Sequence, residues 1–124
     1  MILSYSKEQF KAKIIAGIKI HTIREDKTNR WKLGMTIQQW LYSPRNPQKH
    51  PHQFSTDRCE GLQKIEIKGD FFNGWQIKID GIEITNEQLE ILAINDGFES
   101  SRQFFLWFNK GFKGKIIHWT NFRY

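Results

Sequence analysis

Short stretches of alternating or helically spaced apolar residues, separated by polar turns, cover most of the chain and predict both helices and strands. The first pattern is helical. Phe10 and Ile14 share one face of a helix, and Ser6 with Gln9 three residues later matches a capping box at its start. Gly17 is placed to end this helix, because glycine readily adopts the left-handed conformation that follows many helix C-termini.

Segments typical of strands fill the middle of the chain. Residues 19–25 predict a strand or an extended turn, 36–42 are rich in β-branched and aromatic residues, and 64–68 alternate between polar and apolar side chains. Residues 74–84 predict a hairpin. The segment 43–57 holds all three prolines and no aliphatic side chain, so we expect a long surface loop there.

The last third of the chain predicts two helices and a final strand. Asn86 can cap a short helix, and Ser100 with Gln103 forms a second capping box that opens a helix through Phe108. Residues 114–119 form an apolar run typical of a strand. The order of elements predicts an α+β domain, with about five to six strands in a small curled sheet or β-barrel flanked by three helices.

The length of the chain suits one compact domain, and we expect a single domain over residues 1–124. Cys59 is the only cysteine, which excludes an internal disulfide. The sequence shows no signal-peptide pattern and no apolar run long enough to span a bilayer. We therefore expect a cytoplasmic protein without a membrane partner.

Charge is distributed unevenly around a net value of +6. Residues 1–34 carry eight lysines and arginines against three acids, residues 69–98 carry one against six, and residues 99–124 carry five against one. This distribution predicts a folded domain with a basic side, which would attract phosphates by counterion release. A solvated basic surface without a ligand explains the charge equally well.

Two polar segments could carry chemistry. Residues 19–26 place two cations, a histidine and a hydroxyl directly after the predicted helix end, where they could line a site for an anion or a nucleobase. An edge strand with solvated charges is the simpler interpretation of this segment alone. The segment 95–98 places the carboxylate of Asp96 beside a glycine between two predicted helices, a position at which a plain turn is more common than a general base.

Taken together, these segments resemble a known family. The order and spacing of four motifs look like those of the ASCH domain, and the resemblance extends from about Ile14 to Trp119. The first of the motifs is the most specific, and the third is a useful second mark. The motifs are Gly17-x-Lys19-x-x-Thr22-Ile23-Arg24, Trp31-Lys32-x-Gly34, Asp96-Gly97-Phe98-x-Ser100 and Gly114-x-Ile116-Ile117-x-Trp119.

The resemblance implies a PUA-like fold, in which a small β-barrel and helices border a cleft that binds RNA or a modified nucleoside. One bacterial branch of the family hydrolyses the acetyl amide of N4-acetylcytidine. Its catalytic lysine and threonine match Lys19 and Thr22, and its glutamate falls on Asp96. In these roles Lys19 would deprotonate the Thr22 nucleophile. Asp96 would position a water or protonate the leaving amine, and Arg24 would stabilise the oxyanion.

Hydrolysis ranks below binding for two reasons. Asp96 is one methylene shorter than the glutamate that it would replace, which changes the reach of its carboxylate. Lys19 and Thr22 are three positions apart, so in a regular strand their side chains would point to opposite faces. A catalytic site therefore requires a bulge or a turn between them.

Further residues of these motifs are candidates for holding a ligand. Trp31 is flanked by two cations, as expected for a platform on which a base stacks. His118 lies on the last predicted strand and is expected to face opposite to its apolar neighbours, into the cleft. The candidate binding residues are His21, Arg24, Trp31, Lys32, Ser100 and His118.

No cofactor is expected. His50, His52 and Cys59 are too few and wrongly spaced for a structural zinc site, so we expect no metal centre. The main hypothesis is an RNA- or nucleoside-binding protein with a basic cleft. One alternative is an amidohydrolase acting on an acylated nucleoside, and a metal-assisted ribonuclease is a less favoured enzyme. The other alternative is a protein-interaction module with an inactive cleft.

Overall fold

The computed structural model describes all residues, Met1–Tyr124, and has three α-helices and eight strands, which confirms the α+β class. No helix has both the length and the apolar composition that crossing a membrane would require. The helices are α1 (Glu8–Ile15), α2 (Asn86–Asn95) and α3 (Ser101–Trp107), with a 3₁₀ helix at Pro47–Lys49. The strands are β1 (Ile2–Tyr5), β2 (His21–Arg24), β3 (Thr36–Leu41), β4 (His52–Arg58), β5 (Gly61–Asp70), β6 (Gly74–Ile79), β7 (Ile82–Glu83) and β8 (Phe112–His118).

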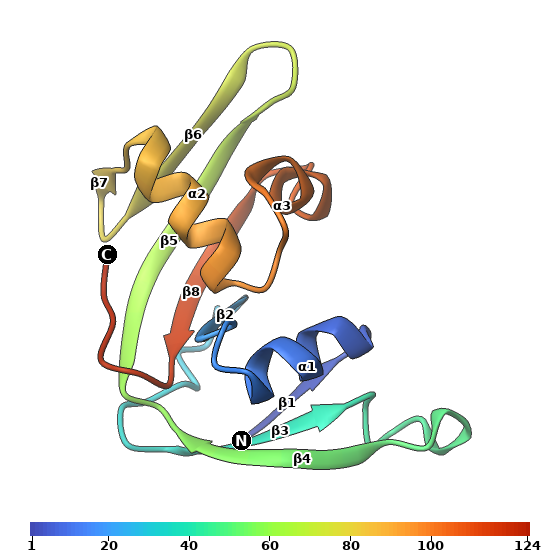
Figure 1. The fold of residues 1–124 in the computed structure, drawn as a ribbon. Coiled ribbons are helices and arrows are strands. Elements are labelled where there is room, and N and C mark those ends of the chain that lie inside the picture. Colours follow the sequence, from blue (N-terminus) through green and yellow to red (C-terminus); the bar gives the residue numbers. More distant parts are fainter.

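The strands form two separate sheets, one of three strands in the order β1-β3-β4 and one of five strands in the order β2-β8-β5-β6-β7. Neither sheet closes on itself, so the structure has eight strands in two open sheets in place of the expected small curled sheet or β-barrel of about five to six strands. Figure 1 shows α2 and α3 lying over one face of the five-stranded sheet, and α1 lying beside β1 and β3.

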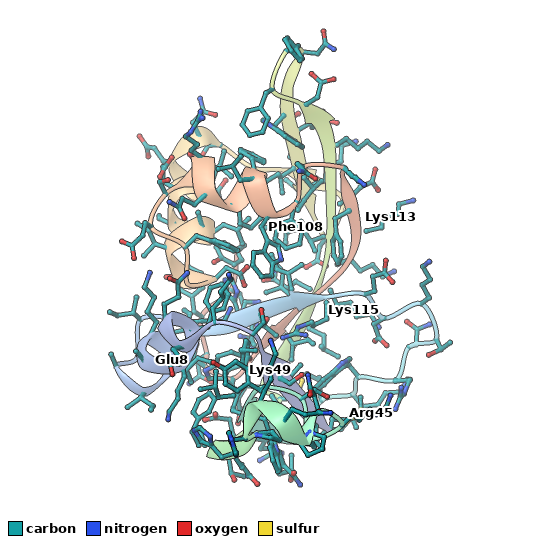
Figure 2. All side chains as sticks on the ribbon, turned by 90° about the vertical axis from the view of Figure 1, so that its right-hand side faces the viewer. Glu8, Arg45, Lys49, Phe108, Lys113 and Lys115 are labelled. Carbon is teal, nitrogen blue, oxygen red and sulfur yellow. The ribbon has the colours of Figure 1, made fainter.

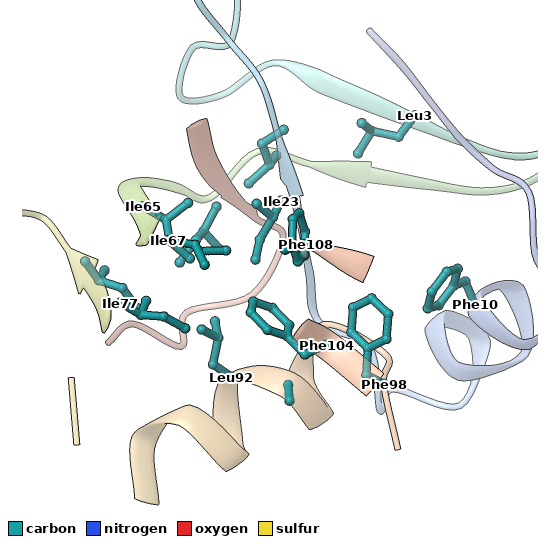
Figure 3. Packing of buried hydrophobic residues seen from close by; sticks show 14 of the residues in the cluster. Leu3, Phe10, Ile23, Ile65, Ile67, Ile77, Leu92, Phe98, Phe104 and Phe108 are labelled. Carbon is teal, nitrogen blue, oxygen red and sulfur yellow. The ribbon is translucent and has the colours of Figure 1, made fainter. Parts of the chain in front are cut away.

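The main core fills the space between the five-stranded sheet and its two covering helices. Ile65, Ile67 and Ile77 alternate with polar residues along their strands, so they all point to the same face. Figure 3 shows these side chains directed toward Leu92 of α2 and Phe104 of α3, both fully buried. Burial of this face fixes the ends of α2 and α3 relative to the sheet, and the candidate site lies at those ends.

The first strand, β1, was not expected from the sequence. It pairs in parallel with β3, with Leu3 opposite Gln39 and Tyr5 opposite Leu41. A parallel partner more than thirty residues away leaves no local pattern in four residues. The helix that follows begins as predicted, but Lys7 occupies its N-cap without a side-chain hydrogen bond, so Ser6 does not cap it.

The loop predicted at 43–57 is shorter than expected, because β4 begins at His52. This strand is polar and largely exposed, and it is held by backbone pairing with β3 along one edge of its sheet. An edge strand that buries little apolar surface has no hydrophobic alternation to detect. The remaining loop contains the 3₁₀ helix and lies against the candidate site.

Candidate functional site

A cavity of about 430 Å³ lies where the two sheets and the three helices meet. It receives side chains from segments at both ends of the chain and from the loop after β3. Figure 2 shows Lys49 of this loop and Phe108 near the end of α3, which both line the cavity. The lining residues are Ser4, Tyr5, Ser6, Phe10, Lys19, Thr22, Ile23, Arg24, Glu25, Tyr42, Ser43, Asn46, Lys49, Asp96, Phe98, Trp107, Phe108 and Phe112.

Lys19 is the central cation of the cavity, and only 2% of it is exposed. Its Nζ donates to the carbonyl of His21 at 2.8 Å, to the carbonyl of Asp96 at 2.5 Å and to the Asp96 carboxylate at 3.3 Å. Lys19 precedes the first residue of β2 and lies in the turn after α1, so it does not follow the alternation of the strand. This turn lets Lys19 line the same cavity as Thr22.

Burial lowers the pKa of Lys19 to about 8, and the negative charge of Asp96 opposes a larger decrease. The three acceptors around Nζ match the three N–H donors of an ammonium group. A neutral amine has only two N–H groups, so its lone pair would face one of these oxygens. Below about pH 8, Lys19 is therefore a buried cation that holds the cavity together.

The side chain of Asp96 is held on its other side by a second buried group. His21 Nδ1 lies 3.2 Å from the same carboxylate oxygen, and it must donate because a carboxylate only accepts. The Nε2 atom of His21 then accepts from the hydroxyl of Tyr124 at 2.5 Å, and Asn95 donates to that hydroxyl at 3.2 Å. Burial lowers the pKa of His21, which keeps the ring neutral and its tautomer fixed.

Gly97 allows Lys19 to approach this acidic junction. Its φ angle of +98° belongs to the left-handed region, and a Cβ atom there would lie 2.8 Å from Phe10 and 2.9 Å from Lys19 Cδ. Only glycine therefore meets both the backbone and the packing requirement. Lys13 strengthens the same junction, because its Nζ donates to the Gly97 carbonyl at 2.9 Å.

Thr22 and Arg24 form the second polar group of the cavity, around the ring of Tyr5. Arg24 Nε lies 3.5 Å from the Thr22 hydroxyl, and its Nη2 donates to the Ser4 carbonyl at 2.9 Å. Two cations lie close to the centre of the Tyr5 ring, Lys19 Nζ at 5.6 Å and Arg24 Cζ at 5.2 Å. Burial raises the pKa of Tyr5, so its hydroxyl stays protonated and donates to Gln39 at 2.7 Å.

Aromatic side chains form the apolar wall of the cavity. Phe10, Phe98 and Trp107 contact one another edge to face, with ring centroids 5.5 to 5.8 Å apart. Trp107 is half exposed at 51%, so one part of its surface is open to solvent beside the cavity. On the opposite side, Tyr42 has a left-handed φ of +63°, and Lys49 Nζ lies 5.7 Å from its ring.

The structure brings Lys19, Thr22, Arg24 and Asp96 to the cavity but places the other candidates elsewhere. His21 and His118 are fully buried, with their rings 5.2 Å apart. His118 bonds to Gln63, and burial lowers its pKa to about 3.

Three further candidates also lie outside the cavity lining. Trp31 belongs to the hydrophobic core and is 5% exposed, so its ring is closed to a stacking base. Lys32 is exposed on the surface. The hydroxyl of Ser100 accepts from the Gln103 backbone and caps α3.

Sequence reasoning missed several residues of the site. Tyr5 lies on the unexpected strand β1, and Trp107, on the predicted last helix, was not among the candidates. Lys49 belongs to the loop expected at 43–57, in which the sequence indicated no binding residue. Tyr124 reaches His21 from the far end of the chain, and no local motif signals that contact.

Comparison of this chain with protein-family models, with curated proteins and with solved structures finds no match.

Gly97→Ala tests the close approach of Lys19 to the acidic junction. We expect the free energy of unfolding to fall by about 2–4 kcal/mol, because left-handed strain and overpacking act together. Gly17→Ala is the matched control, since Gly17 has a φ of +76° with no atom within 4 Å of its Cβ position. It should lose only about 1 kcal/mol in denaturant unfolding. Equal losses would contradict a packing role for Gly97.

The lowered pKa of Lys19 predicts a specific pH dependence. Between about pH 8 and pH 10.5 the unfolded chain carries the lysine proton and the folded chain does not. The free energy of unfolding should therefore rise with pH across this window, relative to Lys19→Met. Denaturant unfolding of both proteins from pH 7 to 10.5 measures the difference. In a ¹³C NMR titration, one lysine resonance should have a midpoint near pH 8, and a uniform set near 10.5 would contradict the prediction.

Proposed function

We propose that this protein binds RNA or a nucleoside in the cavity built around Lys19, as its resemblance to the ASCH domain implies. The observation that carries the proposal is the meeting of Lys19, Thr22 and Arg24 with Asp96, more than seventy residues further along the chain, in one aromatic-lined cavity. The PUA-like family assignment is part of the same proposal. It is supported by the order of the sequence motifs and by a cleft bordered by strands and helices.

The size and chemistry of the cavity suit a nucleoside. Its volume of about 430 Å³ lies within the usual range for small-molecule sites. Trp107 and Tyr42 offer ring faces for a base, and stacking of this kind contributes about 1–3 kcal/mol per base. Arg24 and Lys49 supply positive charge for a phosphate, while hydroxyl and amide groups such as Thr22 and Asn46 can bond to base or ribose edges.

An amidohydrolase acting on an acylated nucleoside is the second candidate, favoured by the pKa of about 8 for Lys19 in a cavity that also contains Thr22. Binding is preferred because the geometry at rest lacks the contact that nucleophile activation needs. No hydrogen bond joins Lys19 Nζ to the Thr22 hydroxyl, and all three donors of Nζ already have acceptors. Catalysis would require a ligand to displace one of them.

Binding of cytidine monophosphate, measured by calorimetry at low salt, tests the main proposal. Arg24→Gln should weaken it at least tenfold, because a charged hydrogen bond contributes about 1.5–3 kcal/mol. Lys49→Gln should weaken it in the same direction without risk to the fold, since Lys49 is exposed. Lys32→Gln removes the same charge outside the cavity and should leave affinity within twofold. Absence of binding by the wild type to this nucleotide and to mixed RNA would overturn the proposal.

Turnover of N4-acetylcytidine distinguishes the hydrolase from the binding protein. For a binding protein we expect no release of acetate by the wild type at high protein concentration from pH 6 to 9. For a hydrolase, turnover would rise as pH approaches 8, where Lys19 begins to lose its proton, and Thr22→Val would abolish it while retaining nucleoside binding. Turnover that persists in Thr22→Val would exclude Thr22 as the nucleophile.

A further inference from the structure

A second hollow, of about 410 Å³, lies on the outer face of the five-stranded sheet and is lined by charged residues. Its only apolar lining residue is Ile65, which is itself buried. The acids that line it are Asp26 and Glu66. We call the five lysines around this hollow the lysine face: Lys27, Lys64, Lys78, Lys113 and Lys115.

The alternation of β5 and its neighbours creates this face. Ile65 and Ile67 point to the helices, so Lys64 and Glu66 point outward. Strand register then sets Lys64 directly opposite Lys115 of β8, and Glu66 opposite Lys113 of β8. The lysines therefore come from separate strands but share one surface.

Most of the positive charge on the lysine face is not neutralised by protein. Five lysines against two acids leave a charge of +3, which is half of the net +6 of the whole chain. Lys115 pairs with Asp26 at 2.8 Å, and Lys113 lies 3.8 Å from Glu66. Lys27, Lys64 and Lys78 have no carboxylate partner within 4.0 Å.

Protection of a sheet edge does not account for these lysines. Edge strands often carry lysine to prevent pairing with another chain, but β5 and β8 are interior strands of their sheet. Like charges directly opposite each other, as at Lys64 and Lys115, are unfavourable for the fold. Asp26 already balances Lys115, so an anion bound here would balance the charge of Lys64, which has no carboxylate partner.

The lysine face and the nucleoside cavity are lined by neighbouring residues of the chain. Glu25 lines the cavity and Asp26, the next residue, lines the hollow. At the start of β8, Phe112 lines the cavity and the next residue, Lys113, lines the hollow. Figure 2 shows Lys113 and Lys115 on one side of a view that also contains Phe108 and Lys49 of the cavity. The segment just after β2 and the start of β8 thus supply residues to both hollows.

We propose that the lysine face binds the phosphate backbone of a single-stranded RNA, one nucleoside of which occupies the cavity. This inference rests on the proposed function and names its partner as a polynucleotide rather than a free nucleoside. Unpaired lysines along a surface are the usual means of tracking a backbone without reading its sequence. An anionic membrane fits less well, because no exposed apolar side chain lines the hollow to enter a bilayer.

The double variant Lys27→Gln/Lys64→Gln tests the inference, because both side chains are exposed and unpaired. Binding of a mixed-sequence 12-nucleotide RNA is measured from about 50 to 300 mM salt. Loss of two phosphate contacts should reduce the slope of log K against log salt by about 1.4 and weaken binding at low salt. Lys7→Gln/Arg102→Gln removes two exposed charges outside both hollows and should leave the slope unchanged.

Cytidine monophosphate separates this inference from the proposed function. We expect Lys27→Gln/Lys64→Gln to bind the mononucleotide like the wild type, whereas Arg24→Gln weakens both ligands. An unchanged RNA slope in the lysine variant, with Arg24→Gln still defective, would overturn the inference alone. RNA binding that depends on the lysines but is unaffected by Arg24→Gln, with no binding of the mononucleotide, would overturn both the cavity proposal and the inference that one RNA occupies both hollows. Binding to anionic phosphatidylserine vesicles but not to RNA would also overturn the inference.

Discussion

The buried ion pair between Lys19 and Asp96 is the contact on which the rest of the cavity depends. Removing an ammonium group from water costs several kcal/mol unless its donors are fully satisfied. Here the three N–H groups meet two backbone carbonyls and one carboxylate oxygen. Because the backbone of both segments takes part, the contact fixes the start of β2 against the end of α2. A backbone bond from Ile20 to Asn95 at 2.9 Å adds to the same junction.

The sequence predicted this junction better than it predicted its surroundings. The motif around Lys19 and the acidic turn at Asp96 carry recognisable residues at recognisable spacing, and they do line one cavity. The helices and most strands were predicted because their apolar faces are local patterns. Strand β1 was not, because four residues with a partner more than thirty residues away form too short a pattern, although Leu3 and Tyr5 are buried. Strand β4 was not, because it buries little apolar surface along the edge of its sheet. Because β1 was not predicted, its aromatic residue Tyr5 was not recognised as part of the site.

Two candidate side chains show why local context does not give side-chain direction. Trp31 is flanked by cations in the sequence, yet its ring enters the core while the charges beside it stay in water. His118 was expected to face the cavity because its neighbours are apolar. Both faces of β8 are covered at that point, so Ile117 and His118 are equally buried, and Tyr124 packs against the histidine with ring centroids 6.0 Å apart. A local sequence pattern does not show that a segment far along the chain will cover a side chain.

The same buried pair that organises the cavity also bears on the choice between binding and catalysis. With its donors engaged and its charge balanced by Asp96, Lys19 leaves Arg24 and Lys49 to attract an anionic ligand, which needs no rearrangement of the pair. A lysine acting as a base must instead lose a proton and turn its lone pair toward Thr22, which breaks a contact that holds two segments together. The energy for that change would have to come from the ligand itself. Binding therefore requires less rearrangement of this structure than hydrolysis does.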